Sequence, residues 1–447
     1  MKIAIASAEL FPFAKVGGLA DAVSSLASSL AKRGNEVYTF LPGFKFINGD
    51  ERFLKKDNYE ITIIKKNDNL KHLFVKHNYY DREGVYGEKG VEYPDNFERF
   101  TFFSEILIEI SYELNVDVIH LNDWHTAYAS LYSLKKFNKK IPVLYTIHNL
   151  AYQGIYPLEY GERCKLGKDA FIPYLHNNMI NFMKIGILTA DAVNTVSKKY
   201  AEEIMTKEFG AGLEDVLIHR KDRLFGIING IDEDVWRVKD ILERKGDYKK
   251  ELQRFVGLNE RDVPVFGLVS RLADQKGFDI LIKCLYDFLK EDIQFVLLGT
   301  GDPRYHEEFL KVQEKYRDKV SINLKFDEEL ALKIYRGSDF FLMPSRFEPC
   351  GLGQMISLVN GTIPIVRKTG GLADTVRDLE YENDGNGIVF VEYSEKELLN
   401  AIKRGIKLYK DKDMMNLLRR RGVESDFSWN RSAGEYEKLY NLIRNKS

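Results

Sequence analysis

The sequence is short of cysteine and of net charge, and both shortages exclude classes of protein. Its three cysteines, Cys164, Cys284 and Cys350, have no CxxC spacing and cannot all pair. This excludes a disulfide framework and a structural zinc site, and it favours a reducing compartment. The 66 basic and 67 acidic residues give a formal net charge of -1. That balance gives no indication of attraction to nucleic acid or to an anionic membrane.

Long apolar stretches are also missing. The apolar start runs only from Ile3 to Ala8 before Glu9 interrupts it, which is too short for the hydrophobic region of a secretory signal. No other run approaches the length of a membrane span. We therefore expect a cytoplasmic protein, and the length of 447 residues predicts two large domains or about three smaller ones.

Familiar catalytic signatures are absent as well. The chain has no GxxxxGK[ST] phosphate loop and no DxD-type pair at a strand end, and no two carboxylates are obviously paired across a sugar. No cluster of metal ligands stands out. We therefore expect neither a metal nor a cofactor, and hydrolysis by two carboxylates is not favoured.

What the sequence does contain is a distinctive stretch from Ser345 to Gly353, SRFEPCGLG. It follows a short apolar run over 339–344, typical of a strand buried on both faces, and it precedes a helix predicted over 352–360. Glu348 thus lies in a turn between a buried parallel strand and a helix N-terminus, where doubly wound sheets bind their ligands. On this stretch alone, an ordinary solvated turn acid is the alternative.

Strands and helices alternate through the first half of the chain. A glycine loop with Lys15, Gly17 and Gly18 joins the first strand to a helix closed by Gly34. Backbone N–H groups at such a helix start can hold an anion, although a Gly-Gly pair is often no more than a tight turn. The other elements predicted here are strands over 2–7, 36–41, 117–121, 141–147, 191–196 and 225–228, and an inserted hairpin of 61–64 with 73–75.

Polar residues follow two successive strands of this half. Asp123 stands in the sequence NDWH at 122–125, and His148 comes directly after the strand over 141–147. A histidine at a strand end is more often structural than catalytic. Here Asp123 follows the preceding strand in the same way, and this raises the chance that His148 is catalytic.

A charged, helical segment over 240–262 is interpreted as a connection to a second doubly wound set. The sequence GGLAD at 17–21 recurs at 370–374, each time between a strand and a helix. This echo suggests two similar halves that face a shared cleft. The elements predicted in the second half are strands over 263–269, 294–298, 320–326, 339–344 and 362–366, and helices starting near 278 and over 327–336, 394–410 and 431–445.

We therefore predict an α/β protein with two doubly wound, Rossmann-like domains facing a cleft. The expected domains are 1–237 and 238–426, with 427–447 as a C-terminal helix that packs back on the first domain. The cleft would collect Lys15, Arg271 and Lys276 with two glycine-lined helix starts. Those groups suit a diphosphate whose leaving oxygen is stabilised by fixed cations rather than by a metal. Transfer of a sugar from a nucleotide fits this inventory better than hydrolysis.

At these positions the chain resembles the bacterial and plant-type glycogen and starch synthases, which are retaining glucosyltransferases of the two-domain GT-B fold (glycosyltransferase family 5). The resemblance runs along the whole chain in the family's order. The matching segments are SAELFP at 7–12, KVGGLAD at 15–21, DN at 95–96 with RF at 99–100, NDWH at 122–125, TIHNLAYQG at 146–154, NGID at 229–232, SRL at 270–272, QKG at 275–277, SRFEPCGL at 345–352 and TGGLADTV at 369–376.

The resemblance implies which residues act on the donor. Glu348, His148, Lys276 and Arg271 would be catalytic, with the two cations on the diphosphate and the other two residues on the transferred glucose. Phe326 would stack on the nucleotide base. The substrate-binding set implied beside them is Lys15, Gly17, Gly18, Asn229, Phe326, Cys350, Gly351, Leu352, Thr369, Gly371 and Leu372.

The resemblance also implies an acceptor side. Glu9, Asp123 and Trp124 would lie toward the acceptor, in domain 1–237, while domain 238–426 would bind the nucleotide sugar. Related retaining transferases often carry a second glutamate for the ribose where this chain has Ile356. That departure favours the synthases that use ADP-glucose.

The implied activity is transfer of glucose from ADP-glucose to the non-reducing end of an α-1,4-glucan, with retention of configuration. The implied partners are ADP-glucose and a glucan such as glycogen or a maltooligosaccharide, without nucleic acid or membrane. One alternative is a related retaining transferase of the same fold that uses UDP-glucose or another acceptor. Another is a catalytically silent glucan-binding protein, which would have no physical need for the full set of catalytic candidates. A sugar phosphorylase of the same architecture is a third, although no lysine beyond the phosphate ligands is a candidate for binding its cofactor.

Overall fold

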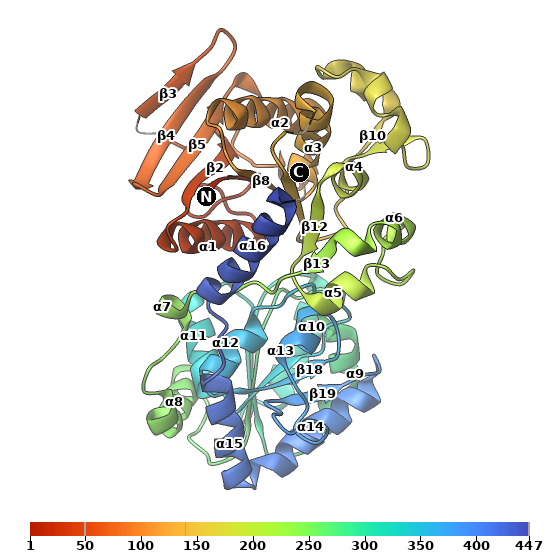
Figure 1. The fold of residues 1–447 in the computed structure, drawn as a ribbon. Helices are drawn as coiled ribbons and strands as arrows, with labels where there is room; N and C mark the ends of the chain where they lie inside the picture. The colour runs from red at the N-terminus through yellow and green to blue at the C-terminus, as the bar shows by residue number, and fades with distance from the viewer. Residues whose placement is uncertain (49–50, 139, 446–447) are drawn as a thin grey trace. The chain divides into compact units, whose positions relative to one another are not determined.

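The chain divides into two compact units in the computed structural model, which describes residues 1–48, 51–138 and 140–445 (Figure 1). Unit 1 contains Met1–Gly230 and the chain from Trp429 onward, and unit 2 contains Ile231–Ser428. The structure thus assigns 231–237 to unit 2, ahead of the boundary expected at residue 238.

Among the described residues, unit 1 is built on a nine-stranded sheet in the order β13-β12-β9-β8-β1-β2-β5-β4-β3. The strands from β13 to β5 run parallel, and β4 and β3 are antiparallel to their neighbours. The predicted hairpin exists as β4 and β5, but it extends the main sheet because β5 pairs with β2. The strands are β1 (Lys2–Ala6), β2 (Glu36–Pro42), β3 (Glu51–Lys55), β4 (Glu60–Asn67), β5 (Leu70–Lys76), β8 (Val118–Asn122), β9 (Val143–Ile147), β12 (Ala192–Thr195) and β13 (Leu224–Gly226).

The winding of this sheet reverses between β1 and β8. These two strands are neighbours, yet β2 and β5 follow on one side and β9, β12 and β13 on the other. Such a reversal leaves a crevice at the carboxyl ends of the strands, which is the usual ligand position of doubly wound sheets. The α-helices of unit 1 are α1 (Gly18–Lys32), α2 (Asn96–Glu113), α3 (Trp124–Phe137), α4 (Phe182–Thr189), α5 (Lys198–Glu203), α6 (Glu214–His219) and α16 (Trp429–Arg444).

Unit 1 also has short elements outside the main sheet. Two small antiparallel pairs and five 3-10 turns lie in its described loops. They are β6 (Gly87–Glu88), β7 (Val91–Glu92), β10 (Ile155–Pro157), β11 (Met179–Asn181), η1 (Asn78–Tyr80), η2 (Leu158–Arg163), η3 (Lys168–Ala170), η4 (Ile172–Tyr174) and η5 (Lys221–Arg223).

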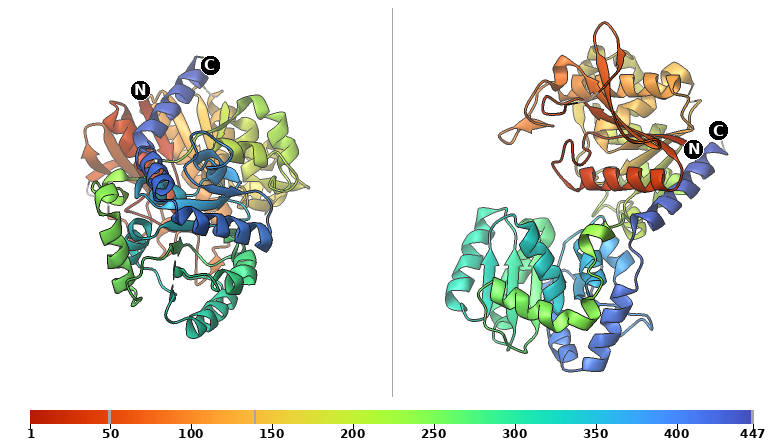
Figure 2. Two further views of the ribbon diagram at one scale, coloured as in Figure 1. Left: turned by 90° about the horizontal axis from the view of Figure 1, so that it is seen from below. Right: turned by 90° about the vertical axis from the view of Figure 1, so that its left-hand side faces the viewer.

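The last helix of the chain, α16, lies beside α1 in unit 1, so red and blue meet in the figures (Figures 1 and 2). Its Tyr440 hydroxyl is 2.8 Å from His120 Nδ1 in β8, and its Tyr436 hydroxyl accepts from Asn194 Nδ2 in β12 at 3.0 Å. Both tyrosines are buried. The chain therefore leaves unit 1 after Gly230 and completes that unit only at its end.

Unit 2 is built, in the described residues, on a six-stranded parallel sheet in the order β16-β15-β14-β17-β18-β19, with helices on both sides (Figure 2). In chain order this is the 3-2-1-4-5-6 arrangement of Rossmann-type sheets, and its reversal lies between β14 and β17. The strands are β14 (Val265–Val269), β15 (Gln294–Leu298), β16 (Val320–Asn323), β17 (Phe340–Met343), β18 (Ile363–Arg367) and β19 (Ile388–Phe390).

The core of unit 2 forms because these strands are nearly continuous apolar runs that are covered by amphipathic helices. Phe266 and Phe340 of adjacent strands stack at 5.1 Å, and Leu281 and Ile402 from two helices belong to the same buried cluster. The helices are α7 (Glu233–Trp236), α8 (Ile241–Phe255), η6 (Asp274–Lys276), α9 (Phe278–Phe288), α10 (Pro303–Lys315), α11 (Glu328–Gly337), α12 (Gly353–Val359), α13 (Gly370–Thr375), α14 (Glu395–Tyr409) and α15 (Lys412–Val423).

The charged segment interpreted as a connection lies inside unit 2, within the expected second domain of 238–426. Its helix α8 packs on α11, and the side chain of Lys245 is buried with its ammonium donating to the Arg336 and Asn360 carbonyls, both at 2.9 Å. A lysine-rich helix looks solvated in sequence, but it can be buried where carbonyl groups accept from its ammonium groups.

No described helix is long and apolar enough to span a membrane.

Candidate active site

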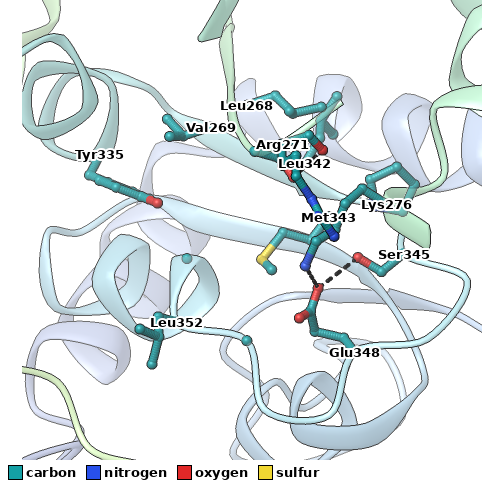
Figure 3. A pocket seen from close by; sticks show the side chains of 14 residues that line it. Leu268, Val269, Arg271, Lys276, Tyr335, Leu342, Met343, Ser345, Glu348 and Leu352 are labelled. Atoms are coloured by element: carbon teal, nitrogen blue, oxygen red, sulfur yellow. Dashed lines mark hydrogen bonds and ion pairs between the residues drawn. The ribbon is translucent and has the colours of Figure 1, made fainter. Parts of the chain in front are cut away.

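The reversal point of unit 2 carries a cavity of about 300 Å³. It is formed where β14 and β17 end, so it lies where strand order predicts a ligand. Figure 3 shows Arg271, Lys276, Ser345 and Glu348 on its wall. The lining residues are Leu268, Val269, Ser270, Arg271, Lys276, Tyr335, Leu342, Met343, Pro344, Ser345, Glu348, Gly351, Leu352 and Gly353.

Glu348 is the centre of the polar contacts in this cavity. Lys276 Nζ lies 2.6 Å from its Oε2, and Ser345 Oγ donates to the same oxygen at 3.1 Å (Figure 3). The side chains of Lys276 and Glu348 are 22% and 7% exposed. Burying a carboxylate to this extent is unfavourable unless a cation and hydrogen-bond donors offset the lost solvation. Both bonds reach Oε2, so within the described residues Oε1 is left to accept from a ligand hydroxyl.

Glycines bring the two turns of the site into close contact. Gly277, between Lys276 and α9, has φ +79°, and a Cβ built on it would lie 2.0 Å from the Pro344 carbonyl oxygen. Gly351 adopts φ +71° in the turn that leads to α12. Positive φ and the lack of space both demand glycine at residue 277. The positions of Lys276 and Glu348 therefore depend on tight backbone packing between their turns.

The start of α13 lies against the same turn. Gly371 N donates to the Glu348 carbonyl oxygen at 3.0 Å, and a Cβ on Gly371 would lie 1.9 Å from the Cys350 carbonyl oxygen. Thr369 and Leu372 flank this contact and are buried. The predicted residues of α13 are thus adjacent to Glu348 without lining the cavity.

Phe326 does not join the described cavity lining. It stands between β16 and α11 and is 83% exposed, which is unusual for a phenylalanine. The predicted stacking on a base remains a prediction.

The reversal point of unit 1 carries a second group of predicted residues. Glu9 Oε2 accepts from the backbone N–H groups of Val16 and Gly17, both at 2.7 Å, and Oε1 accepts from the Tyr86 hydroxyl at 2.6 Å. Glu9 therefore holds the glycine loop at the start of α1. Lys15, in the same loop, is ion-paired with Asp21 at 2.8 Å.

Asp123 and His148 meet at the ends of β8 and β9. Asp123 has φ +57°, and its Oδ1 accepts from the His148 backbone N–H at 2.7 Å. Burial raises the pKa of Asp123 to about 7, although the backbone donors of His148 and Asn149 oppose the shift. His148 Nε2 lies 2.9 Å from Asn122 Oδ1, and burial lowers the pKa of His148 to about 4. The histidine is therefore neutral at physiological pH.

Trp124 and Asn229 are both buried in unit 1. Trp124 begins α3, and a Cβ on Gly154 would lie 2.4 Å from its ring, so the tryptophan packs directly on the loop after β9. Asn229 is 8% exposed, and its Oδ1 has no hydrogen-bond partner among the described residues. Three other buried amide oxygens, those of Asn194, Gln354 and Asn360, are in the same state, so this feature does not by itself identify a ligand position.

Two tyrosines near these groups carried no sequence signal. Tyr335 lines the cavity from α11, where it looked like an ordinary helix residue. Tyr86 binds Glu9 from a loop whose pattern is loose. It stacks on His125 with ring centroids 4.6 Å apart. Tyr86 comes into contact with Glu9 only through the folded conformation of this loop.

Within the described residues, no group of three or more histidine, cysteine, aspartate or glutamate side chains is placed to hold a metal ion.

Comparison with known proteins gives matches along the whole chain. The family profile described as the starch synthase catalytic domain matches residues 2–219, and that of the glycosyl transferases group 1 matches 249–421. The glycogen synthase of Thermosipho melanesiensis is 43% identical over 100% of this chain and 100% of its own length. That of Moorella thermoacetica is 41% identical over 98% of this chain and 96% of its own.

Solved structures agree with the sequence matches. The catalytic domain of starch synthase IV from Arabidopsis thaliana, bound to ADP and acarbose, superposes with a TM-score of 0.86 at 32% identity and covers 99% of both chains. A sucrose-phosphate synthase from Thermosynechococcus elongatus shares the fold with a TM-score of 0.65 at 19% identity.

Proposed function

Because the chain belongs to the glycogen and starch synthases, glycosyltransferases of the GT-B fold, we propose that it transfers glucose from ADP-glucose to the non-reducing end of an α-1,4-glucan with retention. The synthase family and the enzyme class follow from matches over the full chain. The choice of ADP-glucose, the acceptor, the stereochemistry and a cytoplasmic location are the parts proposed. ADP bound in the Arabidopsis starch synthase supports the choice of nucleotide.

The observation that carries the proposal is the pairing of Glu348 with Lys276 in the unit 2 cavity, beside Arg271. The two cations suit a diphosphate that gains charge as it leaves. The carboxylate suits hydroxyl groups of the sugar and the positive charge that develops on it. Among the described lining residues Glu348 is the single carboxylate, so a reaction that needs two carboxylates across one sugar is not supported.

The residue assignments extend this chemistry. Arg271 and Lys276 bind the diphosphate, and Glu348 binds the glucose with the backbone of 350–352. In unit 1, neutral His148 donates through Nε2 to Asn122 Oδ1, so its Nδ1 can accept a hydrogen bond from a sugar hydroxyl. The amide of Asn229 can donate to such a hydroxyl or accept from it. The remaining assignments, which rest on the family resemblance, are Lys15, Gly17, Gly18, Thr369, Gly371 and Leu372 on the diphosphate, Phe326 on the base, and Glu9, Asp123 and Trp124 toward the acceptor.

Retention is proposed to arise on one face of the sugar. The bond from glucose C1 to the diphosphate oxygen breaks as the acceptor hydroxyl oxygen forms its bond to C1 on the same face. The acceptor's proton passes to the departing diphosphate. Glu348 stabilises the oxocarbenium-like centre and forms no bond to it.

The experiment that tests the proposal measures incorporation of labelled glucose into glycogen. The protein is incubated with glycogen and with ADP-glucose or UDP-glucose labelled in the glucose. We expect label in polymer from ADP-glucose at a rate well above that from UDP-glucose, and α-1,4 linkages in the product. Preference for UDP-glucose would identify a different donor. Binding of glycogen without any incorporation would indicate a silent glucan-binding protein.

A further inference from the structure

The turns that carry Lys276 and Glu348 are joined by more than their ion pair. Arg346 N donates to the Gln275 carbonyl oxygen at 2.8 Å, and Gln275 Nε2 donates to the Phe347 carbonyl oxygen at 3.3 Å. These hydrogen bonds lie one or two residues from the ion pair. The separation of Lys276 and Glu348 is therefore set by how the two turns are held together.

A second set of contacts joins the same turns outside the cavity. Asp279, in the first turn of α9, binds the Arg346 guanidinium at 3.3 Å through Oδ2 and accepts from the Tyr393 hydroxyl through Oδ1. The Tyr393 ring lies 4.8 Å from the Arg346 guanidinium and 5.4 Å from that of Arg367. Arg367 in turn donates to the Arg346 carbonyl oxygen. We call Asp279, Arg346, Arg367 and Tyr393 the tyrosine bracket.

The tyrosine bracket reaches both halves of the ion pair through the backbone. Asp279 follows Lys276 by three residues, and Arg346 precedes Glu348 in the turn after β17. None of the four bracket residues lines the described cavity. Tyr393, between β19 and α14, adds a third segment that holds the other two, and burial raises its pKa to about 12, so it remains a hydrogen-bond donor at neutral pH.

The bracket is poorly suited to a role in overall stability. The side chain of Arg346 is 53% exposed and that of Asp279 is 31% exposed, and ion pairs in contact with solvent contribute little to folding. The positions of catalytic groups are more sensitive, because a catalytic pair displaced by about 1 Å can lose about 100-fold in rate.

Resting on the proposed function, we propose that Asp279 and Tyr393 are positioning residues for transfer, clamping the Lys276 turn against the Glu348 turn. The side chains themselves need touch no substrate. Loosening the clamp widens the distribution of Lys276–Glu348 separations and lowers the fraction of molecules in the reactive geometry. The effect then falls on turnover and not on glucan binding.

Tyr393→Phe tests this, because it removes the hydroxyl and keeps the ring that contacts both guanidinium groups. We expect kcat to fall about tenfold, with the KM for glycogen and the melting temperature close to those of the wild type. In a Lys276→Ala background the same substitution should cause no further loss, because residues that act through one another are not additive.

Tyr409→Phe is the matched control, near the amino ends of the central strands β14 and β17. The Tyr409 hydroxyl donates to Asp262, and its ring lies 4.6 Å from Lys249 Nζ and 4.1 Å from Lys412 Nζ. Like Tyr393, it donates to an aspartate and has two cations beside its ring, although its hydroxyl also accepts from Lys249 Nζ at 2.7 Å. It does not contact either catalytic turn. Its removal should leave kcat unchanged.

Hydrogen exchange of the unliganded protein gives a readout that does not depend on activity. In Tyr393→Phe, peptides covering 344–351 should exchange faster than in the wild type, and in Tyr409→Phe they should not. Unchanged exchange together with unchanged kcat would overturn the inference. So would an equal further loss of kcat in the Lys276→Ala background. If the wild type transfers no glucose, the proposed function fails, and the exchange result alone decides whether the bracket holds the turns.

Discussion

At the scale of single residues, one carboxylate oxygen accepts the polar contacts that hold Glu348 in the unit 2 cavity. Glu348 Oε2 accepts from both Lys276 and Ser345. A glutamine at this position would keep the shape and could still accept through its amide oxygen, but it would lose the negative charge. Replacing Glu348 by glutamine therefore tests the contribution of its charge while its packing is kept.

Glu348→Gln should lower kcat by roughly 100-fold or more, as expected for removing a charge-stabilising group, while ADP binds nearly as in the wild type. Turnover and ADP titration calorimetry measure the two effects. Glu251→Gln is the matched control, because Glu251 pairs with Lys333 at 2.5 Å without lining the described cavity. A stoichiometric glucosyl adduct on Glu348, forming and decaying at the catalytic rate, would contradict the one-face reaction.

His120 makes the stability of unit 1 depend on pH. Burial lowers its pKa to about 3, so it stays neutral in the folded state. Below its ordinary pKa of about 6.5 the unfolded chain takes up a proton that the folded chain does not, and stability falls as pH falls.

We expect His120→Asn to weaken this dependence. Between pH 7.5 and 5.5 the wild type should lose about 1.4 kcal/mol more unfolding free energy than the variant, corresponding to roughly one pH unit below the unfolded pKa. Urea unfolding of both proteins at the two pH values measures the difference. Equal losses would show that His120 is protonated in the folded state.

The sequence predicted the residues of the unit 2 cavity that belong to recognisable turns, and missed those that tertiary packing brings there. Lys276 and Glu348 stand in turns after buried strands, which have a clear signature. Tyr335 reaches that cavity from a helix face, and in unit 1 Tyr86 reaches Glu9 from a loop. Neither position differs from ordinary patterning until the chain is folded. The contacts of Glu9 with the glycine loop were hidden for the same reason.

At the scale of elements, the repeated GGLAD segments begin helices in different surroundings. Built Cβ atoms on Gly17 and Gly18 meet nothing within 4 Å. In α13, Gly370 has φ +44°, and a Cβ on Gly371 would lie 1.9 Å from the Cys350 carbonyl oxygen. The same five letters therefore mark an open loop in unit 1 and a close backbone contact in unit 2.

Gly371→Ala should destabilise the protein by about 1–3 kcal/mol, because the added methyl group must push the Cys350 turn away. Gly18→Ala should leave folding stability unchanged or slightly higher, since alanine favours a helix more than glycine does. Thermal and urea unfolding of the two variants provide the comparison. Equal stability of the two variants would mean that the Cys350 turn can move away from the added methyl group without a loss of unfolding free energy.

Elements were predictable where the hydrophobic pattern decides them. The central strands of both sheets are buried on two faces and appear in sequence as apolar runs. The burial of α8 was not expected, because its sequence is highly charged although Lys245 and Lys249 are buried. The helix α15 was not foreseen because few of its residues are buried; they are Met415, Leu418 and Gly422. Tertiary contacts alone reveal that the two α8 lysines are buried.

At the scale of the whole molecule, unit 1 is interrupted by unit 2 and finished by α16. Trp429, Tyr436 and Tyr440 of this helix are buried in unit 1. Unit 2 begins and ends at neighbouring points, since Ile231 N donates to the Phe427 carbonyl oxygen at 2.8 Å. Unit 2 is therefore formed by one continuous segment, whereas unit 1 combines the segment before Ile231 with the helix after Ser428.

A chain truncated after Ser428 should lose protection in unit 1 alone. Removing α16 exposes the apolar surface that its aromatic residues cover and leaves His120 without the Tyr440 hydroxyl. Hydrogen exchange should accelerate in β8, β9 and α1 and stay slow in β14 to β18. Loss of protection in both units, or in neither, would contradict this assignment.

This interruption also fixes an order of events during translation. The ribosome makes β1 to β13 first, but it adds α16 only after it has completed 231–428. Domains generally fold as units during synthesis. Unit 2 is therefore complete while unit 1, most of which is made earlier, still has an exposed apolar face where α16 will pack. A premature stop codon just beyond the codon for Ser428 therefore destabilises unit 1, which is synthesised first, and leaves unit 2 intact.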